Sequence, residues 1–140
     1  GESKAKIADE IFKRVCRPRF VQPTFVLYHP VEISPLAKKR DATTVRRFQL
    51  VAGGLELVNA FSELNDPRDQ ANRLSEQQAI RGRGGQDTHP TDEEFIEALE
   101  YGMPPAAGAG IGIDRLVMLC TNTKNIREVV LFPTLRPRER

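Results

Sequence analysis

Apolar and polar positions alternate along this chain with two different periods. Apolar residues recur at helical spacing between Ile7 and Val15 among charged side chains, which predicts a surface helix that ends before Pro18. Runs rich in branched and aromatic residues, bounded by proline or glycine, predict strands. These runs are Thr24 to Tyr28, Val45 to Ala52 and Leu55 to Glu63, with Val31 to Leu36 expected to continue extended.

Turn and cap residues place the remaining elements. Gly53-Gly54 between two strands predicts an antiparallel hairpin. Asp66 as cap and Pro67 at the first helical position predict a helix to about Arg81. A glycine-rich loop over 82–89 then leads to a helix that begins with Thr91 and Glu94 as a capping box and is closed by Gly102 and Pro104. Hairpin-linked strands with helices in separate blocks predict an α+β fold, an antiparallel sheet flanked by helices.

The segment from Ala107 to Leu119 carries the clearest sign of chemistry. Gly108, Gly110 and Gly112 alternate with other residues, so they should share one face of a strand. Such a bare face indicates close approach of a ligand or of another backbone. Arg115 falls in the first turn of the next helix, where a cation is unfavourable unless an anion is bound there. A nucleotide with its phosphates at Arg115 and tight packing with Arg115 paired to a carboxylate are both consistent with this pattern.

A second group of polar residues lies on the strand from Leu55 to Glu63. Alternation places Asn59, Phe61 and Glu63 on one face, where an amide, a ring and a carboxylate suit a small polar cation. The alternative interpretation has Phe61 in the core and Glu63 at a solvated strand end. Glu56 has the opposite parity, and only a bulge near Gly53-Gly54 or a site across the sheet edge would bring it to the same ligand.

Composition narrows the class of protein. A chain of 140 residues that is 39% hydrophobic fits one globular domain, and it contains no apolar run of membrane-spanning length. The net charge of +2 is too small to predict nucleic-acid binding. Basic clusters at 38–40, 46–47 and 136–138 are expected to be solvated edges. Cys16 and Cys120 are far apart, which favours reduced thiols and a cytoplasmic protein. The chain does not open with methionine, and we expect it to be a piece of a longer protein.

Four runs of the sequence carry a family resemblance. They are Pro30 to Ala37, Asn59 to Asp66, Glu97 to Gly102 and Gly110 to Leu119. The chain resembles the carboxyl-terminal part of the catalytic domain of bacterial-type lysyl-tRNA synthetases, which are class II aminoacyl-tRNA synthetases. The last run looks like motif 3 of that class, at about 108–121, and the run from Asn59 points to lysine. On this resemblance residues 1–140 form one portion of the catalytic domain, without motifs 1 and 2 and without the anticodon-binding domain.

The resemblance implies an enzyme that activates lysine with ATP and transfers it to tRNA, and that is a homodimer at full length. It implies that Arg115 holds the outer phosphates of ATP, beside Gly110 and Gly112. It implies that Asn59, Phe61 and Glu63 bind lysine and that Glu56 helps to hold Mg²⁺. Preorganised charge stabilisation needs every donor in place, so residues 1–140 alone are predicted not to form lysyl-adenylate.

Two positions depart from the family pattern. Gln49 stands where the family usually has a second metal-binding glutamate, and Leu55 replaces a common arginine. A neutral amide still coordinates a hard cation but removes one charge, so weaker Mg²⁺ binding is expected. A paralogue that attaches lysine to a protein and a non-catalytic synthetase-like module are the alternative functions. An aspartate-specific enzyme is disfavoured, because Glu63 would repel the substrate carboxylate.

Overall fold

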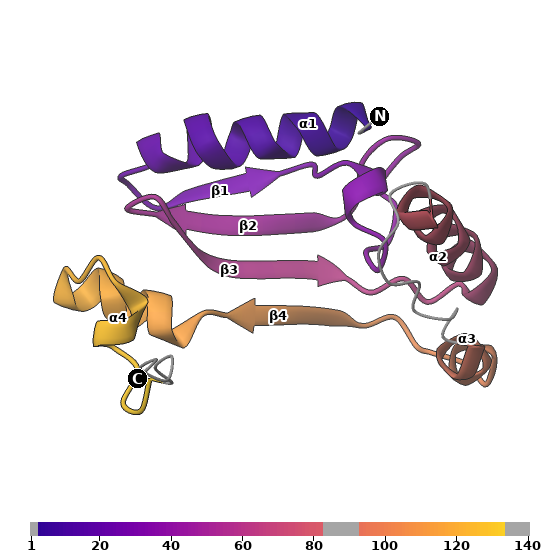
Figure 1. Cartoon of the computed structure of the whole chain (residues 1–140). Helices are drawn as coiled ribbons and strands as arrows, with labels where there is room; N and C mark the ends of the chain where they lie inside the picture. The colour runs from indigo at the N-terminus through magenta and orange to yellow at the C-terminus, as the bar shows by residue number, and fades with distance from the viewer. Residues whose placement is uncertain (1–2, 83–92, 134–140) are drawn as a thin grey trace, which may run out of the picture.

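The structure, a computed structural model, describes residues 3–82 and 93–133, and its centre is a four-stranded antiparallel sheet (Figure 1). The strands follow one another in space in the order β1-β2-β3-β4. They are β1 (Thr24–Leu27), β2 (Arg47–Ala52), β3 (Leu55–Ser62) and β4 (Ala107–Ile111). The α+β class predicted from the sequence is confirmed.

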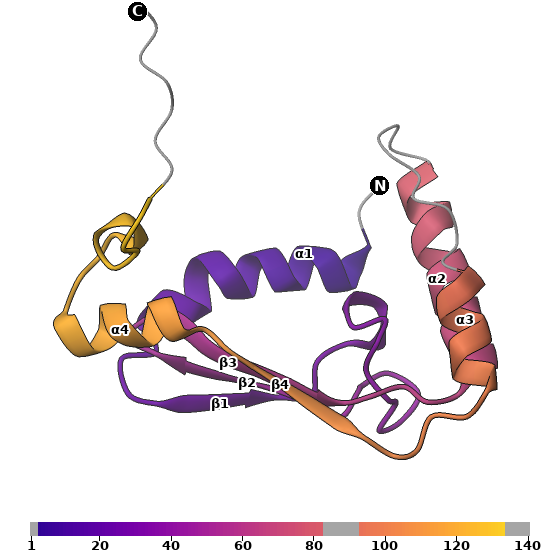
Figure 2. The same ribbon diagram turned by 90° about the horizontal axis from the view of Figure 1, so that it is seen from below.

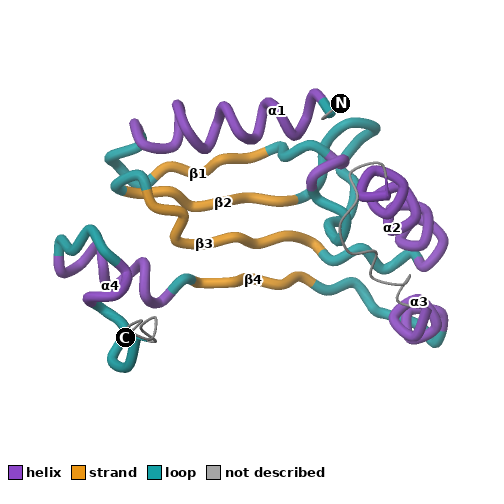
Figure 3. Tube along the Cα trace, viewed as in Figure 1, coloured by secondary structure: helices purple, strands orange, loops and turns teal. Residues whose placement is uncertain are grey.

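Helices lie on one side of this sheet and at the two ends of its strands (Figures 1 and 2). They are α1 (Lys4–Ile11), α2 (Pro67–Gly82), α3 (Glu93–Glu100) and α4 (Ile113–Thr121). Helix α1 runs along the sheet near β1, α2 and α3 pack side by side at one end of the strands, and α4 follows β4 at the other end (Figures 1 and 3). Turned by 90°, the molecule shows α1, α2 and α3 on the same side of the sheet (Figure 2). None of the helices among the described residues is long and apolar enough to cross a bilayer.

The β2–β3 hairpin forms as its glycine pair predicts. Gly53 and Gly54 have φ angles of 56° and 75°. Both lie in the left-handed region, which glycine enters without steric cost and which a two-residue hairpin turn with the right twist requires. The turn packs against the end of the first helical segment, because a Cβ on Gly54 would lie 3.4 Å from the Cα of Pro18.

A β-bulge in this hairpin decides which side chains share a face. Leu50 pairs with Val58 but Val51 pairs with Glu56, which leaves Leu57 as the extra residue. Beyond the bulge, Gln49 lies opposite Asn59. Residues directly opposite in an antiparallel pair point to the same side of the sheet, so the bulge moves Glu56 onto the side that carries Asn59. We call this side the glycine face; it carries Arg47, Gln49, Glu56, Asn59, Phe61, Gly108 and Gly110.

Helix α2 begins at the predicted cap. The Asp66 carboxylate accepts hydrogen bonds from the backbone N–H groups of Arg68 and Asp69, at 2.9 and 3.2 Å. The helix then holds the loop that precedes β2: the buried Gln70 side chain donates to the carbonyl of Pro35 at 3.2 Å. This loop is fixed by side chains of α2.

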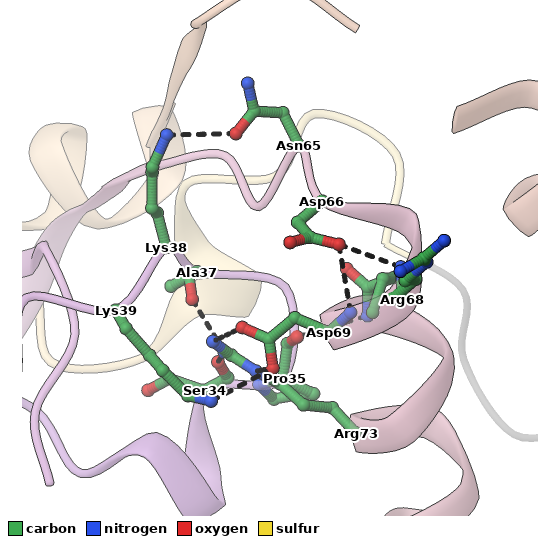
Figure 4. Close-up of polar contacts among 11 residues, drawn as sticks. Ser34, Pro35, Ala37, Lys38, Lys39, Asn65, Asp66, Arg68, Asp69 and Arg73 are labelled. Atoms are coloured by element: carbon green, nitrogen blue, oxygen red, sulfur yellow. Dashed lines mark hydrogen bonds and ion pairs between the residues drawn. The ribbon is translucent and has the colours of Figure 1, made fainter. Parts of the chain in front are cut away.

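The strongest of these contacts form a polar cluster around Arg73, shown in Figure 4. Arg73 is 4% exposed, and it donates to the carbonyls of Ala37 and Ser34 at 2.7 and 3.3 Å. Its Nε and Nη2 donate to the Asp69 carboxylate at 3.1 and 2.9 Å, and Lys39 approaches the same carboxylate at 3.0 Å. The hydrogen bonds from Arg73 are the first cause that lowers the pKa of Asp69.

One sequence expectation about local structure is wrong. Val31 to Leu36 does not continue extended; Val31–Ile33 forms a 3-10 turn that closes with a hydrogen bond from Ser34 N–H to the Val31 carbonyl at 3.0 Å. The loop has local and α2 partners for its backbone, so it needs no neighbouring strand. The first helix, α1, ends at Ile11, before Pro18 as predicted, and the chain then continues through a π turn, Phe12–Cys16, and a 3-10 turn, Arg17–Arg19, whose first turn tolerates the proline. The predicted glycine-rich loop and Thr91 lie outside the described residues.

Candidate active site

The glycines of β4 form a row along β3. Gly110 pairs with Asn59 and Gly108 pairs with Phe61. The row extends past the strand end, because Gly112 N–H donates to the Leu57 carbonyl at 2.8 Å. The sequence prediction of a glycine strand that leads into a helix is confirmed.

Each of the three glycines faces a different neighbour. A Cβ on Gly108 would lie only 2.6 Å from Oε1 of Glu63, so the missing side chain makes room for that carboxylate. A Cβ on Gly112 would meet the aliphatic stem of Arg115 at 3.4 Å. At Gly110 the nearest atom is the backbone oxygen of Asn59 at 3.7 Å, in ordinary contact. The row therefore has a carboxylate at one end, an arginine at the other and no side chain at its centre.

Arg115 is held by backbone. It is the third residue of α4, whose N-cap, Gly112, has no side chain to satisfy the first N–H groups of the helix. Its Nη1 donates to the Glu56 carbonyl at 2.9 Å. No ion pair joins Arg115 to a carboxylate within the part of the chain that the structure describes. An anion at this point would meet both a guanidinium and the positive end of a helix.

Asn59 has a fixed orientation, and Arg47 fixes it. Nε of Arg47 lies 2.8 Å from Oδ1 of Asn59, and Nη1 of Arg47 donates to the hydroxyl of Ser34 at 2.9 Å. Since Nε–H can only donate, the amide oxygen must face Arg47, and the NH₂ group is the end of Asn59 left for a ligand. Burial is the largest cause that lowers the pKa of Arg47, although the nearby charge of Glu56 acts to raise it.

This contact corrects an expectation from the sequence. The 46–47 cluster was expected to be a solvated edge, but Arg47 is half-buried and bonded to a candidate site residue. Lys38, from a second basic cluster, is also half-buried and donates to Oδ1 of Asn65 at 3.0 Å. The 136–138 cluster lies outside the described residues.

Glu63 is half-buried at the end of β3, where its backbone N–H donates to the Ala106 carbonyl at 3.0 Å. No cation forms an ion pair with its carboxylate in the described ranges 3–82 and 93–133. Glu63 also lines a cavity of about 320 Å³ together with Lys38, Arg46 and Pro105. A half-buried carboxylate without a charged partner is suited to a cationic ligand.

The candidate metal ligands, Gln49 and Glu56, reach the same side of the sheet through the bulge. A carboxylate and an amide oxygen are ligand types that Mg²⁺ accepts, so the donor chemistry fits. The charge is low, because Gln49 is neutral and buried, and Glu56 already faces Arg17, with Nη1 and Oε2 separated by 3.8 Å. Among the described residues, no three His, Cys, Asp or Glu side chains gather where they could hold a metal ion.

A larger cavity, of about 350 Å³, is lined in part by Arg47, Phe61 and Gly108 of the glycine face. Its strand residues Leu27, Phe48 and Ala60 pair across β1, β2 and β3, so they share the side of the sheet opposite to the glycine face. The guanidinium of Arg40 covers the ring of Tyr28 at its rim, 4.1 Å from the centroid. Glu63 and Arg115, the charged groups at the two ends of the glycine row, do not line this cavity.

Sequence reasoning missed Arg17, Ser34 and Arg47 as residues near the site. Alternation along β2 puts Arg47 on the side of Gln49, but an unbroken hairpin register would place Asn59 on the other side. The bulge brings Asn59 to the side of Arg47 and Gln49. No sequence signal indicated that the extra residue is Leu57. Arg17 reaches Glu56 only because the first helical segment packs on the hairpin turn at Gly54.

Known proteins resemble this chain over almost its whole length. A family model described as class II tRNA synthetases (D, K and N) matches residues 7–136. The lysine–tRNA ligase of Moorella thermoacetica is 53% identical over 99% of the chain and 29% of the relative. Those of Pelotomaculum thermopropionicum and Deinococcus radiodurans are 54% and 51% identical, over 28% and 27% of their own lengths. The chain thus spans less than a third of the curated relatives that it matches.

Proposed function

The chain belongs to the class II tRNA synthetases of the D, K and N group, and from this membership we propose that the full-length protein containing it activates lysine with ATP and transfers it to tRNA. The relatives cited above are all lysine–tRNA ligases, which favours tRNA over a protein as the acceptor. The charged side chains at both ends of the glycine row form no ion pair with any described residue, which argues against a non-catalytic module, since such a module would gain little from them.

One observation supports this proposal most strongly. Along the glycine row, the Glu63 carboxylate lies over Gly108 and the Arg115 side chain lies over Gly112, with Gly110 open between them. A substrate with an ammonium at one end and phosphates at the other matches this order of charges. The NH₂ group of Asn59, which lies opposite Gly110, would donate to an acceptor oxygen between the two ends.

The proposed roles follow from these positions. Glu63 and Phe61 bind the side chain of lysine, and Asn59 donates to an oxygen of the substrate. Arg115, with the Gly110 and Gly112 backbone, binds the phosphates of ATP and stabilises the charge that develops as pyrophosphate leaves. Mg²⁺, with Glu56 and Gln49 as its candidate ligands, would shield the phosphate charge.

Other properties of the full-length protein belong to this proposal. We place it in the cytoplasm as a homodimer, and we place this chain in the carboxyl-terminal part of the catalytic domain. That placement rests on the resemblance of residues 108–121 to motif 3 of the class. The complete reading frame of the gene tests where this chain lies in the full-length protein. Light scattering of the full-length protein tests whether it is a dimer. A pyrophosphate-exchange assay of residues 1–140 alone should show no turnover.

The decisive test is a lysine titration of the full-length protein and its Glu63→Gln variant. Loss of the carboxylate charge should weaken lysine binding by about tenfold or more, because a charge-assisted hydrogen bond to an ammonium is lost. Glu32→Gln is the matched control, since Glu32 is exposed and lies in the turn before the α2-bound loop. Equal lysine affinity in the parent and the Glu63→Gln variant would refute the assignment of the lysine site.

A further inference from the structure

Two cations of the protein itself contact Glu56, and a third, Arg47, lies near enough for the two charges to interact. Arg115 donates to the backbone carbonyl of Glu56, and Arg17 faces the Glu56 carboxylate at 3.8 Å. The Glu56 and Arg17 side chains are 21% and 31% exposed, so solvent screens their interaction only in part. The Glu56 charge is therefore partly neutralised before any metal ion arrives.

The Arg17–Glu56 contact is a loose one. The separation of 3.8 Å is longer than a hydrogen bond, and Nε of Arg17 is buried without a hydrogen-bond partner among the described residues. A cation held this way can be displaced, unlike Arg73, whose guanidinium has two close contacts to Asp69. The other candidate ligand, Gln49, adds no negative charge that would help a metal ion to compete.

We propose that Arg17 is the resident counter-ion of Glu56 and that it limits how tightly this site takes a divalent cation. A metal ion and the guanidinium compete for one carboxylate, since both need the same negative charge. Removing the charge of Arg17 should therefore tighten metal binding, and the gain should depend on Glu56. The inference rests on the proposed function only for the role of the metal, since Mg²⁺ there accompanies ATP.

The test uses the full-length protein and Mn²⁺ alone, a divalent ion with similar oxygen preference whose free form gives an electron paramagnetic resonance signal. The Arg17→Met variant should bind Mn²⁺ about fivefold more tightly than the parent, or better. In the Arg17→Met/Glu56→Gln double variant this gain should disappear. Arg17→Lys, which keeps the charge, should stay close to the parent. Because no nucleotide or lysine is present, failure of this test is distinguishable from failure of the lysine titration.

Arg14→Met is the matched control, because Arg14 carries the same group on the same helical segment but pairs with Glu10 at 3.3 Å. It should leave Mn²⁺ affinity unchanged. If Arg17→Met does not fold, as judged by circular dichroism, Arg17→Gln is measured instead. It should also bind Mn²⁺ more tightly than the parent. Unchanged or weaker Mn²⁺ binding on loss of the Arg17 charge overturns the proposal, and so does a gain that survives Glu56→Gln.

Discussion

Arg73 and Arg115 are arginines of two different regions of this structure, and their surroundings are opposite. Arg73 is buried, and its Nε, Nη1 and Nη2 all donate to groups of the chain. Arg115 is exposed, and the contact found for it is to one backbone carbonyl. The carboxylates divide in the same way: Asp69 lies between Arg73 and Lys39, whereas Glu63 faces the space over a glycine.

This difference separates scaffold from site. A charge buried with all its partners stabilises one conformation, and removing a partner leaves a costly unpaired group. A charge left unpaired over a bare strand gains little in the free protein and becomes useful only when a ligand supplies the partner. We therefore expect changes in the Arg73 cluster to reduce stability and changes along the glycine row to reduce ligand binding and catalysis.

The largest effect is expected at Arg115. In the full-length protein Arg115→Ala should lower lysine-dependent pyrophosphate exchange by about a hundredfold or more, because a preorganised donor to the developing charge is lost. Circular dichroism and the unfolding midpoint should stay at parent values. Arg68→Ala, at an exposed arginine of α2, is the control and should leave exchange unchanged. If Arg115→Ala keeps the parent exchange activity, Arg115 belongs to the scaffold and not to the site.

An intermediate effect, on stability, is expected at Asp69. Asp69→Asn should destabilise α2 and the loop it holds by about 1–3 kcal/mol, because the buried Arg73 loses its charged acceptor. Hydrogen-exchange mass spectrometry of the α2 peptides in the full-length protein measures this opening. The lysine dissociation constant should change little. A loss of lysine binding without faster exchange in α2 would contradict the division between the two regions.

The same contact should depend on pH with a definite sign. The pKa of Asp69 lies below its ordinary value of 3.8, chiefly because Arg73 donates to the carboxylate. A lowered folded-state pKa gives stability that is complete above the unfolded value and is lost as the pH falls below 3.8 through the folded value. The difference in α2 protection between the parent and Asp69→Asn should accordingly shrink in that acidic range and stay constant at neutral pH.

The smallest of the three effects, and the most discriminating, is expected at Gly110. A Cβ there would meet no atom closer than 3.7 Å, so the free protein has room for the first carbon of a side chain. Gly110→Val should therefore leave the unfolding midpoint equal or higher, since valine favours strands, while ATP or lysine binding weakens by about tenfold. Ala109→Val, one residue away on the opposite side of the sheet, should leave binding unchanged. If Gly110→Val destabilises the protein and the variant binds ATP and lysine as tightly as the parent does, Gly110 serves packing.

The elements that local sequence determines were predicted well. Gly53-Gly54 fixed the β2–β3 turn, because two left-handed residues in succession leave few alternatives. Asp66-Pro67 began α2, and Gly102, with a φ of 112°, closed α3. The prediction for Val31–Ile33 was wrong because its branched residues suggested a strand, whereas its backbone groups have partners within the turn, at Thr43 and in α2.

For the candidate site, the sequence by itself supplied the residue types and their order: a row of glycines, an arginine in the first turn of a helix, and a carboxylate at a strand end. Alternation and capping depend on residues close together in the chain, so they can be predicted from the sequence alone. Only the tertiary structure decided that Glu56 and Asn59 share a side of the sheet and that Arg17 faces Glu56. Both results depend on one extra residue in a strand and on a helix end packed against a turn, and such long-range fits are set by the whole fold.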